Sequence, residues 1–174
     1  AWQGLINSID LSTGWNPPEG YIASANNVPY KGKPPVGFFF QSNDRIQRLK
    51  EVLENRVGID LEFLKRLQRD VFSNGAVELR DYLVPVIIEA GLADSPDIKN
   101  LLNRLEAWDG NYLADSSGAA AFQVLLAKLT PIFYRPHWGE ELAGSFLNRP
   151  GLERTLLKDM EAAPIEDVLR ALAE

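Results

Sequence analysis

The sequence predicts a mainly α protein, a helical bundle that follows a short N-terminal segment of β and irregular structure. Two observations carry this prediction. From Ser42 onward, apolar residues recur at the spacing of three and four that places them on one face of a helix. Before Ser42, apolar residues are mixed with glycine, proline and asparagine, which is typical of short strands and turns. We therefore divide the chain into a strand and loop segment, residues 1–41, and a helical domain, residues 42–174.

The composition is that of a soluble acidic globular protein. The chain has 174 residues, of which 45% are hydrophobic and 24% are charged, enough for one ordinary domain or for a small piece attached to one. The formal net charge of −6 argues against nucleic acid as a partner, because phosphate binding needs a basic surface. No apolar run approaches the roughly 20 residues of a membrane span, and residues 1–4 lack the pattern of a signal peptide. We expect neither nucleic acid nor a membrane as a partner.

The N-terminal segment is expected to hold a turn followed by a short strand. Residues 18–20 read Pro-Glu-Gly, which suits a tight turn because proline pre-sets φ and glycine tolerates the bend that follows. Residues 21–25 form an apolar run that reads as a strand and leads into two asparagines at positions 26 and 27. The three phenylalanines at residues 38–40 are expected to be buried.

Three helices are expected in the next fifty residues. Ser42 or Asn43 is expected to cap the first helix, which ends near residues 56–58. Asp60 is expected to cap the second helix, which ends at residues 73–75. The third helix is expected to span about residues 76–90. The residues expected to face the core are Ile46, Leu49 and Leu53 in the first helix, Leu61, Leu64, Leu67 and Val71 in the second, and Leu79, Leu83, Val86 and Ile87 in the third. Pro85 lies inside the third helix and is expected to kink or split it.

The clearest helix start in the chain is Ser95-Pro96-Asp97, which combines a cap, a proline at the first helical position and an acid in the first turn. The apolar stripe of this helix comprises Ile98, Leu101, Leu102, Leu105 and Trp108, and Gly110 ends it. A following helix is expected to begin at Ser116 or Ser117 and to end at Pro131. Shorter helices are expected at residues 140–147, 151–160 and 164–173.

Asn26 and Arg45 are the two candidates for a functional role. The carboxamide of Asn26 is suited to donate an N–H to a developing oxyanion, the negatively charged oxygen formed during acyl transfer. The alternative is an asparagine that satisfies the backbone of its own turn. Arg45, at the start of the first helix, is suited to orient a site carboxamide or a substrate carboxylate, and the alternative is a solvated arginine. Spacing alone leaves both alternatives open.

Several other chemistries lack the residues that they need. The chain has no cysteine, which excludes disulfides, thiolate metal sites and cysteine nucleophiles, and its single histidine, His137, excludes a histidine-rich metal site. No phosphate-binding loop or metal-ligand spacing occurs, so we expect no cofactor and no metal. His137 and the pair Glu140-Glu141 have no catalytic arrangement around them and are expected to be structural or exposed. Trp108-Asp109-Gly110 is expected to close a helix.

The segment at residues 16–27 reads Asn-Pro-Pro-Glu-Gly-Tyr-Ile-Ala-Ser-Ala-Asn-Asn. It resembles the Asn-Pro-x-x-Gly-Tyr-Ile-x-x-x-Asn-Asn segment of the β-subunit in the penicillin acylase (penicillin amidase) family. Four further landmarks are similar to the family's and follow in its order: Trp2-Gln3-Gly4-Leu5-Ile6, Asp44-Arg45-Ile46, the run from Gln68 to Ser73, and Trp108-Asp109-Gly110. The resemblance covers most of the chain up to about Phe133.

The resemblance implies an N-terminal-nucleophile hydrolase, an enzyme that cleaves itself and uses the new N-terminal serine, with its own α-amino group as base, to attack an amide. In this family the oxyanion hole uses a backbone N–H and the first asparagine of the pair, which corresponds to Asn26, and an arginine near the site corresponds to Arg45. Trp2 matches an interior family position, so the serine nucleophile is not in this chain. Some members bind calcium in the loop after the asparagines, but residues 28–41 contain no acid.

The resemblance therefore implies a fragment: a helical domain with the segment before it, which belongs to the αββα core of the parent enzyme. The parent is expected to cleave a small N-acyl amide, such as a β-lactam side chain or an acyl homoserine lactone. Its partners would be the α-subunit and the rest of the β-subunit, and its location the periplasm or the exterior of the cell. The fragment alone is expected to be inactive. The alternative from another class is a non-enzymatic helical binding or scaffold domain, in which Asn26 is a turn residue.

Overall fold

The computed structural model describes residues 4–11, 13–29, 37, 39–54, 56–149 and 151–174. The chain divides into two compact units, Ala1–Arg69 and Asp70–Glu174, which we call unit 1 and unit 2 and describe separately. The boundary expected after residue 41 coincides with the change to helical structure, and as a domain boundary it stays a prediction. The expectations for Trp2 and Phe38 lie outside the described residues.

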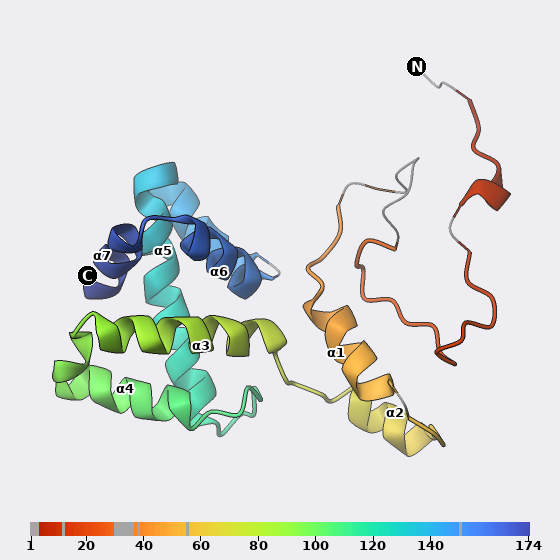
Figure 1. The fold of residues 1–174 in the computed structure, drawn as a ribbon, viewed down its shortest axis with the longest axis horizontal. Coiled ribbons are helices and arrows are strands. Elements are labelled where there is room, and N and C mark those ends of the chain that lie inside the picture. Colours follow the sequence, from red (N-terminus) through yellow and green to blue (C-terminus); the bar gives the residue numbers. More distant parts are fainter. Residues whose placement is uncertain (1–3, 12, 30–36, 38, 55, 150) are drawn as a thin grey trace. The chain divides into compact units, whose positions relative to one another are not determined.

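The predicted mainly helical fold is confirmed (Figure 1). The described residues form seven α-helices: α1 (Asp44–Leu53), α2 (Leu61–Leu67), α3 (Asn74–Glu89), α4 (Pro96–Glu106), α5 (Ser117–Ser145), α6 (Leu152–Ala162) and α7 (Ile165–Ala173). Short 3-10 helices lie at Ser8–Asp10, Leu92–Asp94 and Phe146–Asn148. None of the described helices is both long and apolar enough to cross a bilayer.

The N-terminal segment of unit 1 is irregular. The expected turn is present: the backbone N–H of Gly20 donates to the carbonyl of Pro17 at 2.9 Å, and Gly20 has a φ of 78°. The strand expected at residues 21–25 does not form among the described residues. A strand is stable only when a neighbouring strand accepts and donates its backbone hydrogen bonds, and no described segment of unit 1 offers one.

The two helices of unit 1 differ in how well the sequence predicted their buried faces. In α1, Ile46 is buried and Leu49 is half-buried, as expected. In α2, Asp60 caps the helix by accepting from the N–H of Phe63 at 2.7 Å, but Leu61 and Leu64 are exposed and Phe63 is the buried residue. The prediction for this face was wrong, because a helix of two turns packs through its largest side chain, here Phe63, rather than through every leucine.

Helix α3 begins unit 2 and is not split by its proline. Ser73 caps it by accepting from the N–H of Ala76 at 3.3 Å, and the helix continues through Pro85 without interruption. A proline inside a helix costs about 3 kcal/mol. Leu83 and Ile87, on either side of Pro85, are both buried in one core, and the burial of two such side chains offsets that cost. The expected split therefore does not occur.

Helix α4 ends at Glu106, before the expected end at Gly110, and the Trp108-Asp109-Gly110 turn that follows it anchors the start of α3. The indole N–H of Trp108 donates to the carbonyl of Asn111 at 2.8 Å, and the Asp109 carboxylate accepts from the N–H of Asn111 at 2.9 Å. The carbonyl of Gly110, whose φ is 87°, accepts from the N–H of Ser73 at 3.1 Å. A left-handed φ favours glycine, so Gly110 permits a turn that ties two helix ends together.

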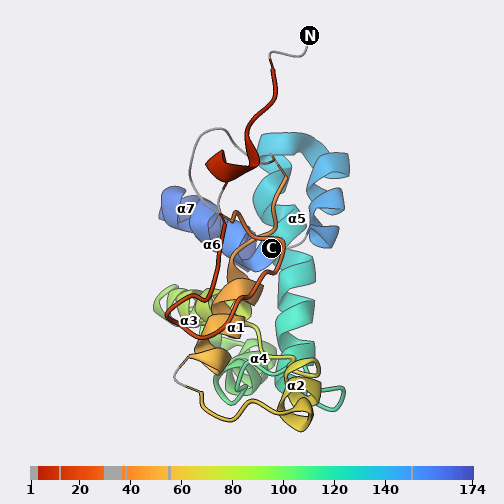
Figure 2. The ribbon, with the colours of Figure 1, turned by 90° about the vertical axis from the view of Figure 1, so that its right-hand side faces the viewer.

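Helix α5 does not end at Pro131. It extends from Ser117 to Ser145 with two prolines inside it, and its φ and ψ leave the helical region only at Gly139, with values of 76° and 170°. Figure 2 shows the chain changing direction after the long straight part of α5. Phe133 and Tyr134 lie just beyond Pro131 and are both buried, so the helical path keeps them in the core. The helical path is interrupted at Gly139 and not at a proline, because only glycine adopts the required φ without a steric cost.

The core of unit 2 is built by all five of its α-helices. Helices α3 and α6 pack on each other, α4 packs on α5, and α7 packs on both α5 and α3 (Figure 1). The largest fully buried side chains of this core are Phe122, Leu79, Leu83, Leu105, Leu156, Met160, Val168 and Thr130. Tyr134 adds a polar link, because its hydroxyl donates to the Asp159 carboxylate at 2.6 Å and joins α5 to α6.

Tyr112 makes the stability of unit 2 sensitive to high pH. Burial raises the pKa of its phenol from 10.0 to about 12, although the hydrogen bond that Gln123 donates to the phenol oxygen at 2.8 Å lowers it. Above pH 10 the unfolded chain loses this proton before the folded chain does. The unfolded state then binds fewer protons, so stability is expected to fall between about pH 10 and pH 12.

A Tyr112→Phe variant is expected to lose less stability than the unchanged chain when the pH rises from 9 to 11. Urea unfolding at the two pH values measures this difference. Tyr82 and Tyr134 also have raised pKa values, so the loss should shrink rather than vanish. An equal loss in the variant and in the unchanged chain would show that Tyr112 is not responsible.

Candidate functional site

Asn26 lies at a left-handed turn in unit 1. Its φ is 58°, a conformation that asparagine adopts more readily than most residues. The preceding Ala25 is buried, and the carbonyl of Asn26 accepts from the N–H of Gln41 at 2.8 Å. The backbone of Asn26 is therefore held on both sides, while its side chain is exposed.

The two neighbouring asparagines use their side chains differently. The Asn27 carboxamide accepts from the N–H of Ala25 at 3.2 Å and donates to the carbonyl of Val28 at 3.1 Å. The Asn26 carboxamide makes no hydrogen bond within the part of the chain that the structure describes. The alternative of an asparagine that satisfies its own turn thus fits Asn27, and the N–H groups of Asn26 are available to an external acceptor.

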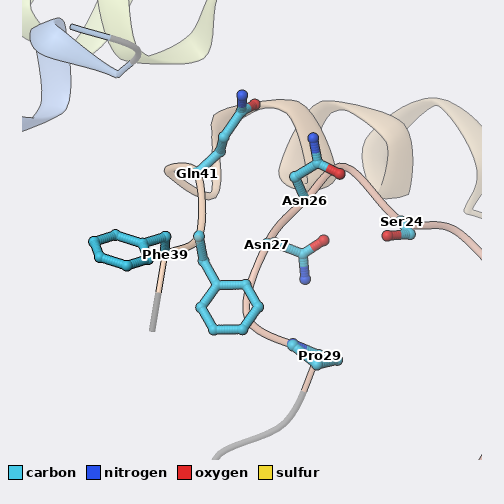
Figure 3. Close-up of a pocket in the computed structure, with 7 residues that line it drawn as sticks. Ser24, Asn26, Asn27, Pro29, Phe39 and Gln41 are labelled. Atoms are coloured by element: carbon cyan, nitrogen blue, oxygen red, sulfur yellow. The ribbon is translucent and has the colours of Figure 1, made fainter. Parts of the chain in front are cut away.

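A cavity of about 520 Å³ opens beside these asparagines. It is lined by Ser24, Asn26, Asn27, Pro29, Phe39, Phe40 and Gln41. Figure 3 shows the carboxamides of Asn26 and Asn27 pointing in different directions from the same turn. The lining combines amide and hydroxyl groups with aromatic rings, which suits a ligand that has both a polar and an apolar part.

Arg45 lies in the first turn of α1 and is not among the residues that line this cavity, but it contacts one of them. Its guanidinium donates to the side-chain oxygen of Gln41 at 3.4 Å. Gln41 itself lines the cavity and also donates its backbone N–H to Asn26. The structure therefore connects both candidate residues, Asn26 and Arg45, through Gln41.

Two features around this cavity were not predicted from the sequence: the contacts of Gln41 and the exposure of the phenylalanines. Phe39 is 100% exposed and Phe40 is 37% exposed, although residues 38–40 were expected to be buried. Among its described residues, unit 1 buries only the apolar side chains of Ala25, Ile46 and Phe63, so it offers no core large enough to take these rings. No periodicity signals Gln41, because its role depends on a contact between two segments that lie apart in the sequence.

The remaining candidates stay outside any catalytic arrangement. His137 is exposed, as expected, and its ring lies 6.2 Å from that of Phe133. Glu140 forms an ion pair with Arg135 at 2.8 Å. Among the described residues, no three side chains of the metal-binding types come together.

Comparisons with known proteins agree with the landmarks in the sequence. The family model described as penicillin amidase matches residues 1–173. Among curated proteins, penicillin G acylase of Escherichia coli is 30% identical over 122 residues, which cover 67% of this chain and 14% of that protein. The chain thus spans a small part of the length of this relative. No solved structure gives a match. Since the family model matches nearly the whole chain, the protein belongs to the penicillin amidase family.

Proposed function

We propose that this chain is part of an amide hydrolase that cleaves the bond between an acyl group and an amine. Family membership supports the reaction class, and the match to 14% of the length of the acylase supports a larger enzyme. The single observation that carries the assignment of a site is the exposed Asn26 carboxamide, which has no hydrogen-bond partner among the described residues and lines a cavity. The α-subunit and the rest of the β-subunit would supply the remaining parts of the active site.

In this proposal Asn26 acts as an oxyanion donor. An N-terminal serine in another part of the enzyme attacks the amide carbonyl, and its own α-amino group takes the proton. The carbonyl oxygen becomes negative, and the side-chain N–H of Asn26 donates to it. A donor that already points to solvent needs no internal hydrogen bond to be broken, so little reorganisation opposes the reaction.

Arg45 is proposed to support the site through charge and orientation. Its guanidinium is held by a neutral partner, Gln41, so its positive charge is not cancelled by that contact. A cation near the cavity stabilises a developing negative charge and attracts a substrate carboxylate. The substrate is proposed to be a small N-acyl amide, and the parent enzyme is proposed to act in the periplasm or outside the cell.

A non-enzymatic binding domain is the second candidate. Unit 2 has a groove of about 310 Å³ between α4, α5 and α7, to which Leu101, Ile132 and Leu172 contribute apolar surface. A helical scaffold would use such a groove to hold a partner. The gene upstream separates the two candidates: an in-frame extension with a self-cleaving Gly-Ser junction supports the hydrolase, and an unrelated domain supports the scaffold.

The purified chain alone is expected to show no turnover of chromogenic phenylacetyl or fatty-acyl amides, whereas the complete enzyme should hydrolyse at least one of them. The reason is that the proposed nucleophile lies outside this chain. Release of the chromophore measures the rate, and a serine-directed sulfonyl fluoride should label the complete enzyme and abolish its activity. Hydrolysis by the chain alone would contradict the assignment of the nucleophile. A complete enzyme that hydrolyses no acyl amide would contradict the function.

A further inference from the structure

Gln41 makes two contacts that join the candidate site. Its backbone N–H donates to the carbonyl of Asn26 at 2.8 Å, and its side-chain oxygen accepts from the guanidinium of Arg45 at 3.4 Å. It also lines the cavity beside Asn26. The residue lies shortly before α1, whose first residue is Asp44.

We propose that Gln41 is a positioning residue: its backbone N–H holds the turn that carries Asn26, and its side chain orients Arg45 relative to that turn. This inference rests on the proposed function, since it concerns the same site. Gln41 acts through its two partners, and the reacting atoms need not touch it.

The surroundings of Asn26 explain why such a link matters. The segment that carries Asn26 is irregular, and of its described residues between 4 and 29 only Ala25 is buried. Helix α1, by contrast, is held by the buried Ile46 and by its own backbone hydrogen bonds. The Gln41 N–H therefore ties a weakly held turn to the segment that leads directly into a regular helix. A displacement of about 1 Å in a catalytic group is enough to cost a large factor in rate.

The chemistry of the side chain fits this role. A guanidinium needs an acceptor to fix its direction, and a carboxamide oxygen supplies one without adding charge. Glutamate would keep the acceptor and hold Arg45 more strongly, but it would offset the positive charge. Methionine has a similar length and shape but a much weaker acceptor. These two replacements separate the geometry of the contact from its charge.

In the complete enzyme, Gln41→Met is expected to lower kcat roughly 3- to 10-fold with little change in KM for an uncharged acyl amide, the loss that one modest hydrogen bond would cause. Gln41→Glu is expected to lose less kcat than Gln41→Met on the same substrate, because the acceptor remains. The loss that it still shows measures the cost of offsetting the positive charge of Arg45. Thermal unfolding of both variants should stay close to that of the unchanged enzyme, since the Gln41 side chain is polar and only half-buried.

A double-mutant cycle with Arg45→Met tests whether the effect passes through Arg45. In the Arg45→Met background, Gln41→Met is expected to reduce kcat no further. The inference would be overturned if Gln41→Met lowered kcat as much in the Arg45→Met background as in the unchanged enzyme. It would also be overturned if Gln41→Met alone left kcat unchanged.

The proposed function is tested separately, by the activity of the unchanged enzyme and by the activity of the Asn26→Asp variant. If the enzyme is active and Asn26→Asp loses activity while Gln41→Met does not, the positioning role is wrong and the hydrolase assignment stands. If the enzyme is inactive, or if Asn26→Asp is harmless, the hydrolase assignment falls and the role of Gln41 falls with it.

Discussion

Replacing Asn26 with alanine in the complete enzyme is expected to lower kcat/KM by about 10²- to 10³-fold, or roughly 3 kcal/mol of transition-state stabilisation. The alanine side chain has no N–H to donate to the oxyanion, and the neighbouring backbone contacts do not replace it. Steady-state hydrolysis of a chromogenic acyl amide measures the effect. Any fall in the unfolding midpoint is expected to come from backbone strain and not from lost packing, because the Asn26 side chain is exposed and its φ is left-handed.

The left-handed backbone of Asn26 calls for two further variants. Its φ of 58° costs alanine about 1–2 kcal/mol, so Asn26→Ala combines strain with the loss of the donor. Asn26→Gly accepts this φ without strain, and Asn26→Asp keeps the shape and tolerates the conformation. If both variants retain nearly full turnover, Asn26 is not the oxyanion donor, whatever alanine does.

Asn27→Ala is the matched control for the same turn. This substitution removes the side-chain contacts to Ala25 and Val28 and leaves the Asn26 carboxamide in place. A loss confined to about tenfold is expected, because those contacts are local and worth about 1 kcal/mol each. A loss as large as that of Asn26→Asp would mean that the turn, rather than one donor, carries the effect.

Replacing Gly118 with alanine is expected to destabilise unit 2 by about 3 kcal/mol, near the upper end for overpacking. Gly118 lies in the first turn of α5, and a methyl group there would collide with Cβ of Trp108 and lie 2.7 Å from its Cγ. It would also lie 2.9 Å from the carbonyl oxygen of Arg104, which is backbone and cannot easily move. Urea unfolding of the chain measures the change.

Gly144→Ala, in the part of α5 beyond the break at Gly139, controls for the general effect of the substitution. Apart from its chain neighbours and the backbone of its own helix, no atom lies within 4 Å of the position that its methyl group would take. Alanine is expected to stabilise a helical position such as this by about 0.5–1 kcal/mol relative to glycine. If Gly118→Ala were as mild as Gly144→Ala, the close approach of α5 to Trp108 would not be needed for the fold.

Most of the helical structure could be predicted from the sequence, because its signals are local. Ser73, Asp60 and Ser116 each accept a backbone N–H at the start of a helix, and these helices begin at or close to the expected residues. Two expectations about prolines were wrong: α3 is not split at Pro85, and α5 does not end at Pro131. The buried residues around each proline outweigh a lost hydrogen bond.

Only part of the candidate site could be predicted from the sequence. Asn26 and Arg45 follow from the resemblance, and their catalytic roles remain predictions. Gln41 could not be found in this way, because the contact that defines it joins residues on separate segments. The exposure of Phe39 was also missed, since a run of aromatic residues indicates burial only where a core exists to receive it.

By itself, the sequence determined the helical class, the order of the helices and the landmark segment that ends in the two asparagines. Caps, periodicity and turn residues act within a few positions, so they can be read along the chain. Only the three-dimensional structure showed which asparagine is engaged by its own turn and which is left open, because that depends on where each carboxamide points. It also decided that Asn26 and Arg45 share one partner. Hydrogen bonds between distant segments exist only once the chain has brought those segments together.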